Sequence, residues 1–410
     1  MSQNPTKKIS TLANGLTVVS DTITAVDSVA LGAWVGVGTR YESMQHNGIA
    51  HMVEHMMFNG THTRNAQEIS TSIEQVGGQM NAYTSRETTA YYVHLLKDHA
   101  SLATEIIADM ITHSTFPEDE IEKERGVIAQ EIGMSLDTPD DFVFDLHQNI
   151  SYPEQSLGAP ILGTTDIINN LNQQDFKQYV SDHYHTGNMV LAASGNIQHD
   201  DLCALGEKFF IDLPQGSKST YQPARYIGGT HHEEKPLEQT HIVTGYQGVD
   251  KYHHHYYSAM LLSLIMGGGM ASRLFQEIRE KRGLAYSIYS MHSAYDDDGQ
   301  FEIYAGTGPD TAHESIDLIQ CEIDKICKNH VETDELNRAK AQLKSSIVMG
   351  QESMLSRTNR MAKYFLAHGQ LSDTHSLIKK IDTVTIDDIK NIANLIFNTP
   401  CTTVTLGSKK

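Results

Sequence analysis

Residues 118–135 read EDEIEKERGVIAQEIGMS, and residues 333–350 read TDELNRAKAQLKSSIVMG. Both stretches begin with acidic residues and then place apolar residues at helical spacing, so each predicts a long helix. A second pair of stretches has a similar offset. DFKQYVSDHY and NMVLAASG, within 175–195, are matched by DDIKNIANLIF and CTTVTLGS, within 387–408. Self-similarity with a period of about 210 residues predicts two copies of one domain.

The elements around these pairs predict the fold class. The first copy starts with β-rich stretches at 15–21 and 27–37 and continues with a strand pair at 81–96. The second copy has strand-like stretches at 284–294 and 299–308. Helical stretches alternate with the strands in both copies. We therefore expect an α+β fold of two homologous domains, each a largely antiparallel sheet packed with helices.

The predicted boundary between the copies is a stretch without periodicity. PQGSKSTYQPARYIGGTHHEEKP combines Pro, Gly, Ser and charged residues, as linkers do. We expect a first domain at 1–212, a linker at 213–236 and a second domain at 237–410.

Composition and charge restrict the class of protein. The chain has 410 residues, too many for one ordinary core, and its net charge of −20 argues against nucleic acid as a partner. No apolar run is long enough to span a bilayer, so we expect no membrane insertion. The N-terminal stretch lacks the apolar core of a secretory signal, which predicts a cytoplasmic protein. The four cysteines are widely spread and predict reduced thiols rather than a disulfide framework.

Residues 46–61, HNGIAHMVEHMMFNGT, contain the motif H-x-x-E-H at His51, Glu54 and His55. On a helix, His51 and His55 lie one turn apart on one face, where two imidazoles can hold one divalent metal. Glu54 lies beside them, where a carboxylate can take a proton from a metal-bound water. The motif is the reverse of the H-E-x-x-H signature of zinc proteases. The alternative is an amphipathic helix whose two histidines only form hydrogen bonds.

A catalytic zinc needs a third protein ligand, and the helix predicted at 118–136 offers two carboxylates. Glu124 and Glu131 lie seven residues apart, almost two helical turns, so both project from one face. We expect Glu131 to bind the metal and Glu124 to orient a ligand or the water. The alternative is that both belong to a solvated acidic face.

The motif and its surroundings resemble a known family. The last Glu of E-x(6)-E stands 76 residues after His55, a pattern similar to the zinc peptidases related to pitrilysin, insulin-degrading enzyme and the mitochondrial processing peptidase. NGLTVV near the start, NAYT at 81–84 and RLFQEIREKRGLAYS at 273–287 are similar as well, so the resemblance covers almost the whole chain. It is most similar to the processing peptidase β subunit and its short bacterial relatives.

The resemblance implies a set of roles in the first copy. His51, His55 and Glu131 become the ligands of one Zn2+ per chain. Glu54 becomes the base that activates the water, and Glu124 becomes the supporting carboxylate. These roles predict a zinc-dependent endopeptidase whose partners are peptide substrates.

The resemblance also implies roles in the second copy. Arg279 and Tyr286 have the spacing of an Arg and a Tyr that complete the site in longer relatives, where they would position substrate and stabilise the oxyanion. Those relatives close two double-domain halves on each other, whereas this chain has the length of one half. We therefore expect a homodimer in which Arg279 and Tyr286 of one subunit serve the metal site of the other. On the residues alone, Arg279 could equally cap a helix and Tyr286 could pack in a strand.

Four neighbouring residues predict how substrate binds. Asn81, Ala82, Tyr83 and Thr84 resemble the edge strand on which family substrates lie extended, paired through backbone hydrogen bonds. Phe58 matches the family position that lines the pocket after the cleaved bond. Its spacing also suits a core aromatic.

Two acids predict a preference for basic peptides. Asp141 and Asp145 are four residues apart and match family positions that bind an arginine just before the cleavage point. The alternative is that both favour the N-terminus of a helix and solubility. The resemblance thus favours extended, basic peptides or presequence-like segments as substrates.

The second copy offers no metal ligands. SRLFQEIREKRG stands where we expect the counterpart of the metal helix, and residues 345–347 stand where Glu131 would be. The histidine tracts at 231–232 and 253–255 lack a carboxylate partner at suitable spacing and are expected to be surface histidines. The alternative function is a non-catalytic structural or assembly subunit derived from the same family.

Overall fold

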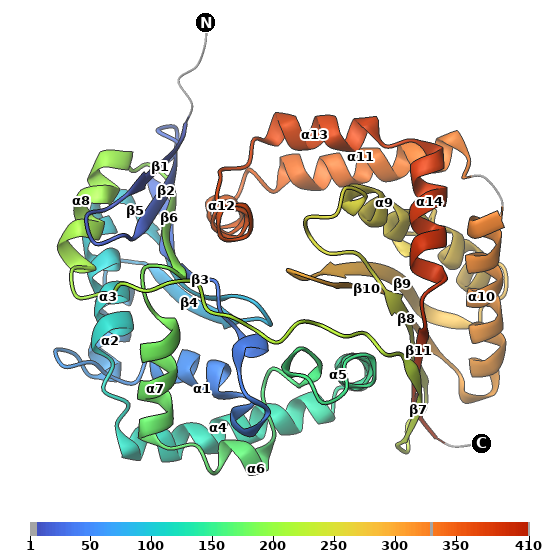
Figure 1. Ribbon diagram of the computed structural model, residues 1–410, viewed down its shortest axis with the longest axis horizontal. Coiled ribbons are helices and arrows are strands. Elements are labelled where there is room, and N and C mark those ends of the chain that lie inside the picture. Colours follow the sequence, from blue (N-terminus) through green and yellow to red (C-terminus); the bar gives the residue numbers. More distant parts are fainter. Residues whose placement is uncertain (1–5, 329–330, 409–410) are drawn as a thin grey trace, which may run out of the picture. The chain divides into compact units, whose positions relative to one another are not determined.

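The computed structural model describes residues 6–328 and 331–408, and these form two compact units (Figure 1). Unit 1 comprises residues 6–132, 160–222 and 348–373. Unit 2 comprises residues 133–159, 223–347 and 374–408, without the undescribed 329–330. Each unit contains one mixed sheet packed with helices, which confirms the predicted fold class.

The elements follow one another in the order that the repeat predicts. The strands are β1 (Lys7–Thr11), β2 (Thr17–Thr22), β3 (Ser28–Val35), β4 (Gln79–Thr84), β5 (Thr89–Leu96), β6 (Met189–Gly195), β7 (Gly229–Glu234), β8 (Thr240–Gln247), β9 (Ala285–Ala294), β10 (Gly299–Thr307) and β11 (Cys401–Gly407). The α-helices are α1 (Ile49–Met56), α2 (Ala66–Glu74), α3 (Ala100–His113), α4 (Glu118–Leu136), α5 (Pro139–Ser151), α6 (Thr165–Ile168), α7 (Gln173–His183), α8 (His199–Phe209), α9 (Tyr256–Gly267), α10 (Ala312–Lys328), α11 (Thr333–Met349), α12 (Met354–His368), α13 (Thr374–Thr383) and α14 (Ile386–Phe397).

The two sheets share one topology. The sheet of unit 1 has the order β1-β2-β6-β3-β5-β4, and the sheet of unit 2 has the order β7-β11-β8-β10-β9. β2 pairs with β6 in parallel, β7 pairs with β11 in parallel, and the other neighbours are antiparallel. The second sheet therefore repeats the last five strands of the first, and both are largely antiparallel as expected.

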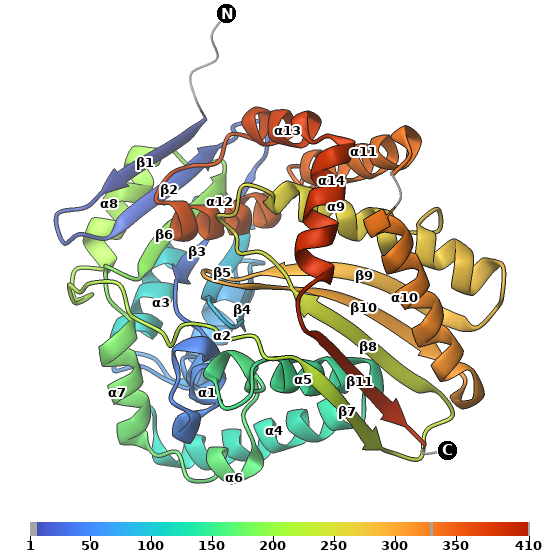
Figure 2. The same ribbon diagram turned by 45° about the vertical axis from the view of Figure 1, so that its right-hand side comes forward.

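Each sheet buries both of its faces. In unit 1 the strands and the helices α1, α3 and α8 enclose the larger core, and in unit 2 the strands and α9, α10 and α14 do the same. The opposite face of each sheet is covered by one helix. α12 packs on β6, β3 and β2, and α5 packs on β11, β8 and β7 (Figure 2).

The two covering helices come from the other half of the chain. α5 lies in the first sequence copy but belongs to unit 2, where Val143 joins Val243 and Val404 in a small core. α12 lies in the second copy but belongs to unit 1, where Met361 packs with Trp34. The compact units therefore differ from the contiguous domains expected at 1–212 and 237–410, because each sheet takes one helix from the other copy.

The predicted linker is partly structured. Residues 229–234 form β7, which pairs with β11 from Thr402↔Gly229 to Gly407↔Glu234. The last part of the linker expected at 213–236 therefore belongs to the second sheet. Its side chains alternate between half-buried and exposed. Because the sequence GTHHEE is polar throughout, it shows no alternation of apolar and polar residues that would predict a strand.

The counterpart of the metal helix was also misplaced. In chain order α1 follows β3, and the helix that follows β8 is α9. SRLFQEIREKRG instead contains a π-helix, Phe275–Glu280, at the place of α2. α9 reads YYSAMLLSLIMG and contains no His, Asp or Glu.

No helix of residues 6–328 and 331–408 is both long and apolar enough to cross a membrane.

A buried ion pair fixes α12 on the first sheet. Arg357 of α12 donates from Nη2 and Nε to Oδ2 of Asp21, at 2.7 and 3.0 Å. Asp21 lies in β2 and is 1% exposed. A carboxylate buried to this degree loses its hydration, and the ion pair with Arg357 compensates for that cost in free energy.

Arg357→Leu should therefore destabilise the protein by about 2–4 kcal/mol, since it leaves the buried carboxylate of Asp21 without its cation. Urea unfolding followed by fluorescence of the single tryptophan, Trp34, measures the loss directly beside α12. The double variant Asp21→Asn/Arg357→Leu is the control and should recover part of the loss. A single variant as stable as the wild type would contradict this assignment.

Candidate metal centre

Helix α1 presents its polar side chains on one face because its apolar side chains are buried on the other. Ile49, Ala50, Met52, Val53 and Met56 are buried in the core of unit 1. The motif residues are half-buried on the opposite side, and the rings of the two histidines are 4.6 Å apart. The helical periodicity of the motif therefore places all three of its functional side chains together, as predicted.

The N-terminus of α1 is held by a buried carboxylate. Oε1 of Glu42 accepts a hydrogen bond from the amide of Ala50 at 2.7 Å, and its Oε2 accepts from Gly48 and Asn47. Burial raises the pKa of Glu42 to about 8, and the three donors oppose that rise. Gly48 has φ +94°, and a Cβ there would lie 2.8 Å from Cα of Gly163, so a side chain would disturb this start.

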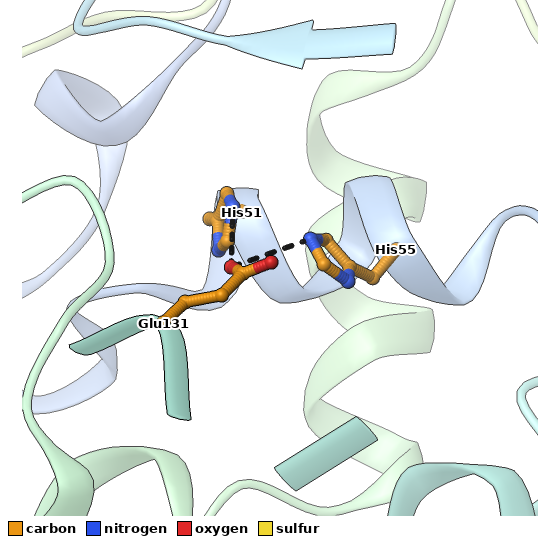
Figure 3. A group of neighbouring side chains, drawn as sticks. All are labelled: His51, His55 and Glu131. Carbon is orange, nitrogen blue, oxygen red and sulfur yellow. Dashed lines mark ion pairs between the residues drawn. The ribbon is translucent and has the colours of Figure 1, made fainter. Parts of the chain in front are cut away.

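Glu131 of α4 reaches the two histidines of α1 (Figure 3). Its Oε2 lies 3.7 Å from Nε2 of His51 and 3.7 Å from Nε2 of His55. The three ligand atoms lie within 4.8 Å of one another, and no other such group of His, Cys, Asp or Glu occurs among the described residues. The structure therefore brings together the three residues predicted as ligands.

This geometry fits a zinc ion. The 3.7 Å separations are too long for hydrogen bonds between these atoms. A tetrahedral zinc with bonds of about 2.1 Å holds its ligand atoms about 3.4 Å apart. Two imidazole nitrogens and one carboxylate oxygen are also the ligand types of catalytic zinc sites with an open fourth position. His51, His55 and Glu131 could therefore hold the metal with only small adjustments.

Glu124, the residue predicted as the supporting carboxylate, contacts the ring of His55. Nδ1 of His55 lies 3.0 Å from Oε2 of Glu124, whose Oε1 accepts a hydrogen bond from Asn59 at 3.0 Å. The bond to His55 lowers the pKa of Glu124. Burial lowers the pKa of His55, but the bond to Glu124 and the nearby charges outweigh it and raise the pKa. With Nδ1 donating to Glu124, Nε2 is directed toward Glu131 and can bind a metal.

His51 is held differently. Its Nδ1 is buried and has no hydrogen-bond partner in the described part of the chain. Burial lowers the pKa of His51 to about 4, and the neighbouring His55 contributes to the shift. The ring is therefore neutral near pH 7, which is the form that binds a metal.

Glu54 lies beside the ligands and is hydrogen-bonded to the edge strand of the sheet. Oγ1 of Thr84, the last residue of β4, donates to Oε2 of Glu54 at 2.5 Å. Burial raises the pKa of Glu54, and the bond from Thr84 acts in the opposite direction. A raised pKa brings a carboxylate closer to the range in which it both accepts and returns a proton.

The residues predicted to bind substrate in the first copy lie on and near β4. β4 is the terminal strand of its sheet and contains Asn81, Ala82 and Tyr83. Tyr83 donates its hydroxyl to Asn359 of α12 at 2.6 Å. Phe58 is half-buried against the core, with its ring 6.4 Å from that of Tyr91. Phe58 thus has the packing of a core aromatic and keeps only part of its surface accessible.

Arg279 and Tyr286 lie in unit 2 and contact each other. The guanidinium of Arg279 lies 4.9 Å from the ring centre of Tyr286 and 4.7 Å from that of Phe275. Tyr286 is 76% exposed at the start of β9, so it is not packed in the sheet. Arg279 lies in the π-helix, a rare element that often occurs at functional sites.

Asp141 and Asp145 lie on α5, also in unit 2. Asp141 is exposed in the first turn, and Asp145 is half-buried one turn later. The structure thus places both acids on one helical face, as the spacing predicts.

Three residues near the motif were not predicted. Glu42 holds the start of α1, Asn59 holds Glu124, and Thr84 holds Glu54. Asn59 and Glu42 lie within twelve residues of the motif. Their spacing in the sequence does not predict that Asn59 contacts Glu124 or that Glu42 contacts the first amides of α1. Thr84 is the last residue of the predicted edge strand, but no sequence pattern indicated that its hydroxyl contacts Glu54.

Two sequence profiles match the chain. The one described as Insulinase (Peptidase family M16) matches residues 17–165, and the one described as Peptidase M16 inactive domain matches residues 170–343. An uncharacterized zinc protease of Rickettsia felis is 41% identical over 404 residues, which cover 97% of each chain. An uncharacterized zinc protease of Bacillus subtilis is 37% identical over 388 residues, covering 94% of this chain and 95% of that protein.

Solved structures share the fold. The crystal structure of a protease from Helicobacter pylori has a TM-score of 0.91 at 25% identity and covers 98% of this chain and 99% of that one. A peptidase M16 inactive domain from Pseudomonas fluorescens has a TM-score of 0.92 at 20% identity, with 98% of each chain covered.

Two repeated α+β units, with one His–Glu cluster among the described residues, fit the class of the relatives named zinc proteases, the metallopeptidases. The relatives establish which kind: the chain belongs to peptidase family M16. The narrower resemblance to the processing peptidase β subunit stays a prediction.

The two carboxylates of α4 should differ in their effect on metal affinity. Glu131→Gln should abolish stoichiometric zinc binding, because it removes a ligand. Glu124→Gln should weaken binding about 10- to 100-fold, the usual effect of losing a partner that orients a ligand. Competition with a chromogenic chelator measures both affinities. Glu122→Gln, an exposed position on the same helix, is the control, and a Glu124→Gln variant with wild-type affinity would contradict the role of Glu124.

Proposed function

We propose that this chain is a zinc-dependent endopeptidase that hydrolyses extended, basic peptides or presequence-like segments. The observation that carries the proposal is the convergence of His51, His55 and Glu131 within 4.8 Å, with Glu54 beside them on the same helix face. Membership in family M16 and relatives named zinc proteases support it.

The residues of the chain have distinct tasks in this reaction. Zinc bound by His51, His55 and Glu131, one ion per chain, would act as a Lewis acid and lower the pKa of water at the site. The carboxylate of Glu54 takes the proton from the attacking water and returns it to the leaving amine. Glu124 keeps Nδ1 of His55 protonated and so keeps Nε2 available as a ligand.

Substrate would bind as an added strand. β4 ends its sheet, and its outer edge can pair with an extended peptide through backbone hydrogen bonds. The amide of Ala82 already donates to the side chain of Asn81 at 2.8 Å, which a peptide carbonyl could replace. Such binding selects the extended conformation rather than a particular sequence. Phe58 is proposed to contact the residue after the cleaved bond.

Arg279 and Tyr286 are proposed to act at the metal site of a second copy of the chain. The two side chains contact each other, and Tyr286 is exposed. The guanidinium of Arg279 and the phenol of Tyr286 could therefore bind the same ligand. Together they could bind the scissile carbonyl as negative charge develops on it. A homodimer would then contain two complete sites without any other subunit.

The alternative of a non-catalytic structural subunit is not favoured. A chain retained only for assembly has no need for three ligands, an oriented imidazole and a carboxylate base. All of these are present in unit 1.

Glu54→Gln should keep zinc and lose turnover by about 10²- to 10⁴-fold, because the amide cannot accept the proton. Zinc content by mass spectrometry and cleavage of a fluorogenic peptide library provide the two measurements. Glu74→Gln, at an exposed position in α2, is the matched control. Full turnover in a zinc-loaded Glu54→Gln sample would refute the mechanism.

The acids of α5 should decide the preference for basic peptides. If Asp141 and Asp145 bind an arginine, Asp141→Asn/Asp145→Asn should reduce kcat/KM selectively for peptides with arginine before the cleaved bond. Cleavage-site profiling of a peptide library measures this preference. Asp140→Asn, one residue earlier on the same helix, is the control. An arginine preference that is absent in the wild type, or unchanged in the variant, would exclude the acidic pocket.

A further inference from the structure

We propose that Thr84 is a positioning residue that fixes the carboxylate of Glu54 for proton transfer and thereby links the edge strand β4 to the base. The inference rests on the proposed function above. It concerns the side-chain hydroxyl of Thr84, whereas the predicted substrate strand concerns the backbone of residues 81–84.

The contact itself is short and directional. Oγ1 of Thr84 donates to Oε2 of Glu54 at 2.5 Å. Thr84 is the one hydrogen-bond donor to this carboxylate among residues 6–328 and 331–408. Glu54 has three rotatable side-chain bonds, and a hydrogen bond to a charged group contributes about 1.5–3 kcal/mol. One bond of this strength is enough to select a single orientation of the carboxylate.

Thr84 can hold Glu54 because its own position is fixed from two sides. Its backbone pairs with Thr89 at the end of the β4–β5 ladder. The preceding residue, Tyr83, is held by Asn359, whose Oδ1 also accepts a hydrogen bond from Trp34 at 3.0 Å. A β-branched side chain such as Thr has few χ1 rotamers, so a fixed backbone fixes the hydroxyl.

This arrangement leaves one carboxylate oxygen without a donor among the described residues. The Thr84 hydroxyl keeps its proton and holds Oε2, so Oε1 of Glu54 is the less stabilised and more basic oxygen, which is then the one to accept the proton from water and give it to the leaving amine. A peptide paired with β4 is aligned on the same backbone that carries Thr84. The position of the scissile bond and the direction of the base are thus set by one strand.

Thr84→Val tests this role because it keeps the shape of the side chain and removes the hydroxyl. We expect kcat to fall about 10- to 100-fold, with KM and zinc affinity within twofold of the wild type. Thr84→Ser keeps the hydroxyl and should restore kcat to within about threefold. Thr84→Ala serves as a second variant without the hydroxyl if Thr84→Val does not fold.

Thr22→Val is the matched control on another strand of the same sheet, β2. Its hydroxyl donates to the carbonyl of Ile197 at 2.9 Å rather than to Glu54, so it should lose stability but not kcat. Thermal melting and chelator competition on all variants separate a loss of fold or metal from a loss of orientation.

The outcomes distinguish the two proposals. An active wild type with an equally active Thr84→Val variant overturns the role of Thr84, as does a Thr84→Ser variant as slow as Thr84→Val. A rise in KM at constant kcat also overturns it, because the residue would then bind substrate. A zinc-loaded wild type that cleaves no peptide overturns the proposed function and the inference with it.

Discussion

The burial of one side of α1 is the constraint on which the candidate site depends. Met52, Val53 and Met56 are fully buried, so the helix cannot rotate without exposing them. The residues that flank and separate them, which include both histidines and Glu54, must then face away from the core. Glu42 fixes the same helix along its axis by binding its first amides. Metal ligands need this precision, because a ligand displaced by 1 Å no longer completes a coordination shell.

A second helix completes the arrangement from a distance of 76 residues in sequence. α4 provides Glu131 to the histidines and Glu124 to the far nitrogen of His55. Two carboxylates spaced by seven residues, almost two helical turns, lie on one face of α4 and so can both reach α1. Burial lowers the pKa of His51 and raises that of Glu54, whereas the hydrogen bond between His55 and Glu124 acts to raise the pKa of His55 and to lower that of Glu124.

The repeat, the sheets and the two-histidine motif could be predicted from sequence because each rests on local periodicity. The motif needs only the helical spacing of His51 and His55, and the expected strand pair at 81–96 is β4 and β5. β7 could not be predicted, because a strand at the edge of a sheet needs few apolar residues and this one has none. The exchange of α5 and α12 could not be predicted from local sequence patterns either. Both helices have ordinary amphipathic sequences, and an amphipathic pattern does not indicate which sheet a helix covers. The hydrogen bonds of Glu42, Asn59 and Thr84 depend on tertiary positions that spacing does not encode.

The exchange of α12 has a consequence for synthesis on the ribosome. Trp34 and Asn359, which share a hydrogen bond, are 325 residues apart in the chain. One face of the first sheet, with Val190 and Ala192 beside the tryptophan, therefore has no cover until α12, which ends at His368, has been translated. The first copy cannot finish folding before the second emerges, in contrast to the usual order in which N-terminal domains fold first. An apolar sheet face left open for that time would be a natural binding site for a chaperone during translation.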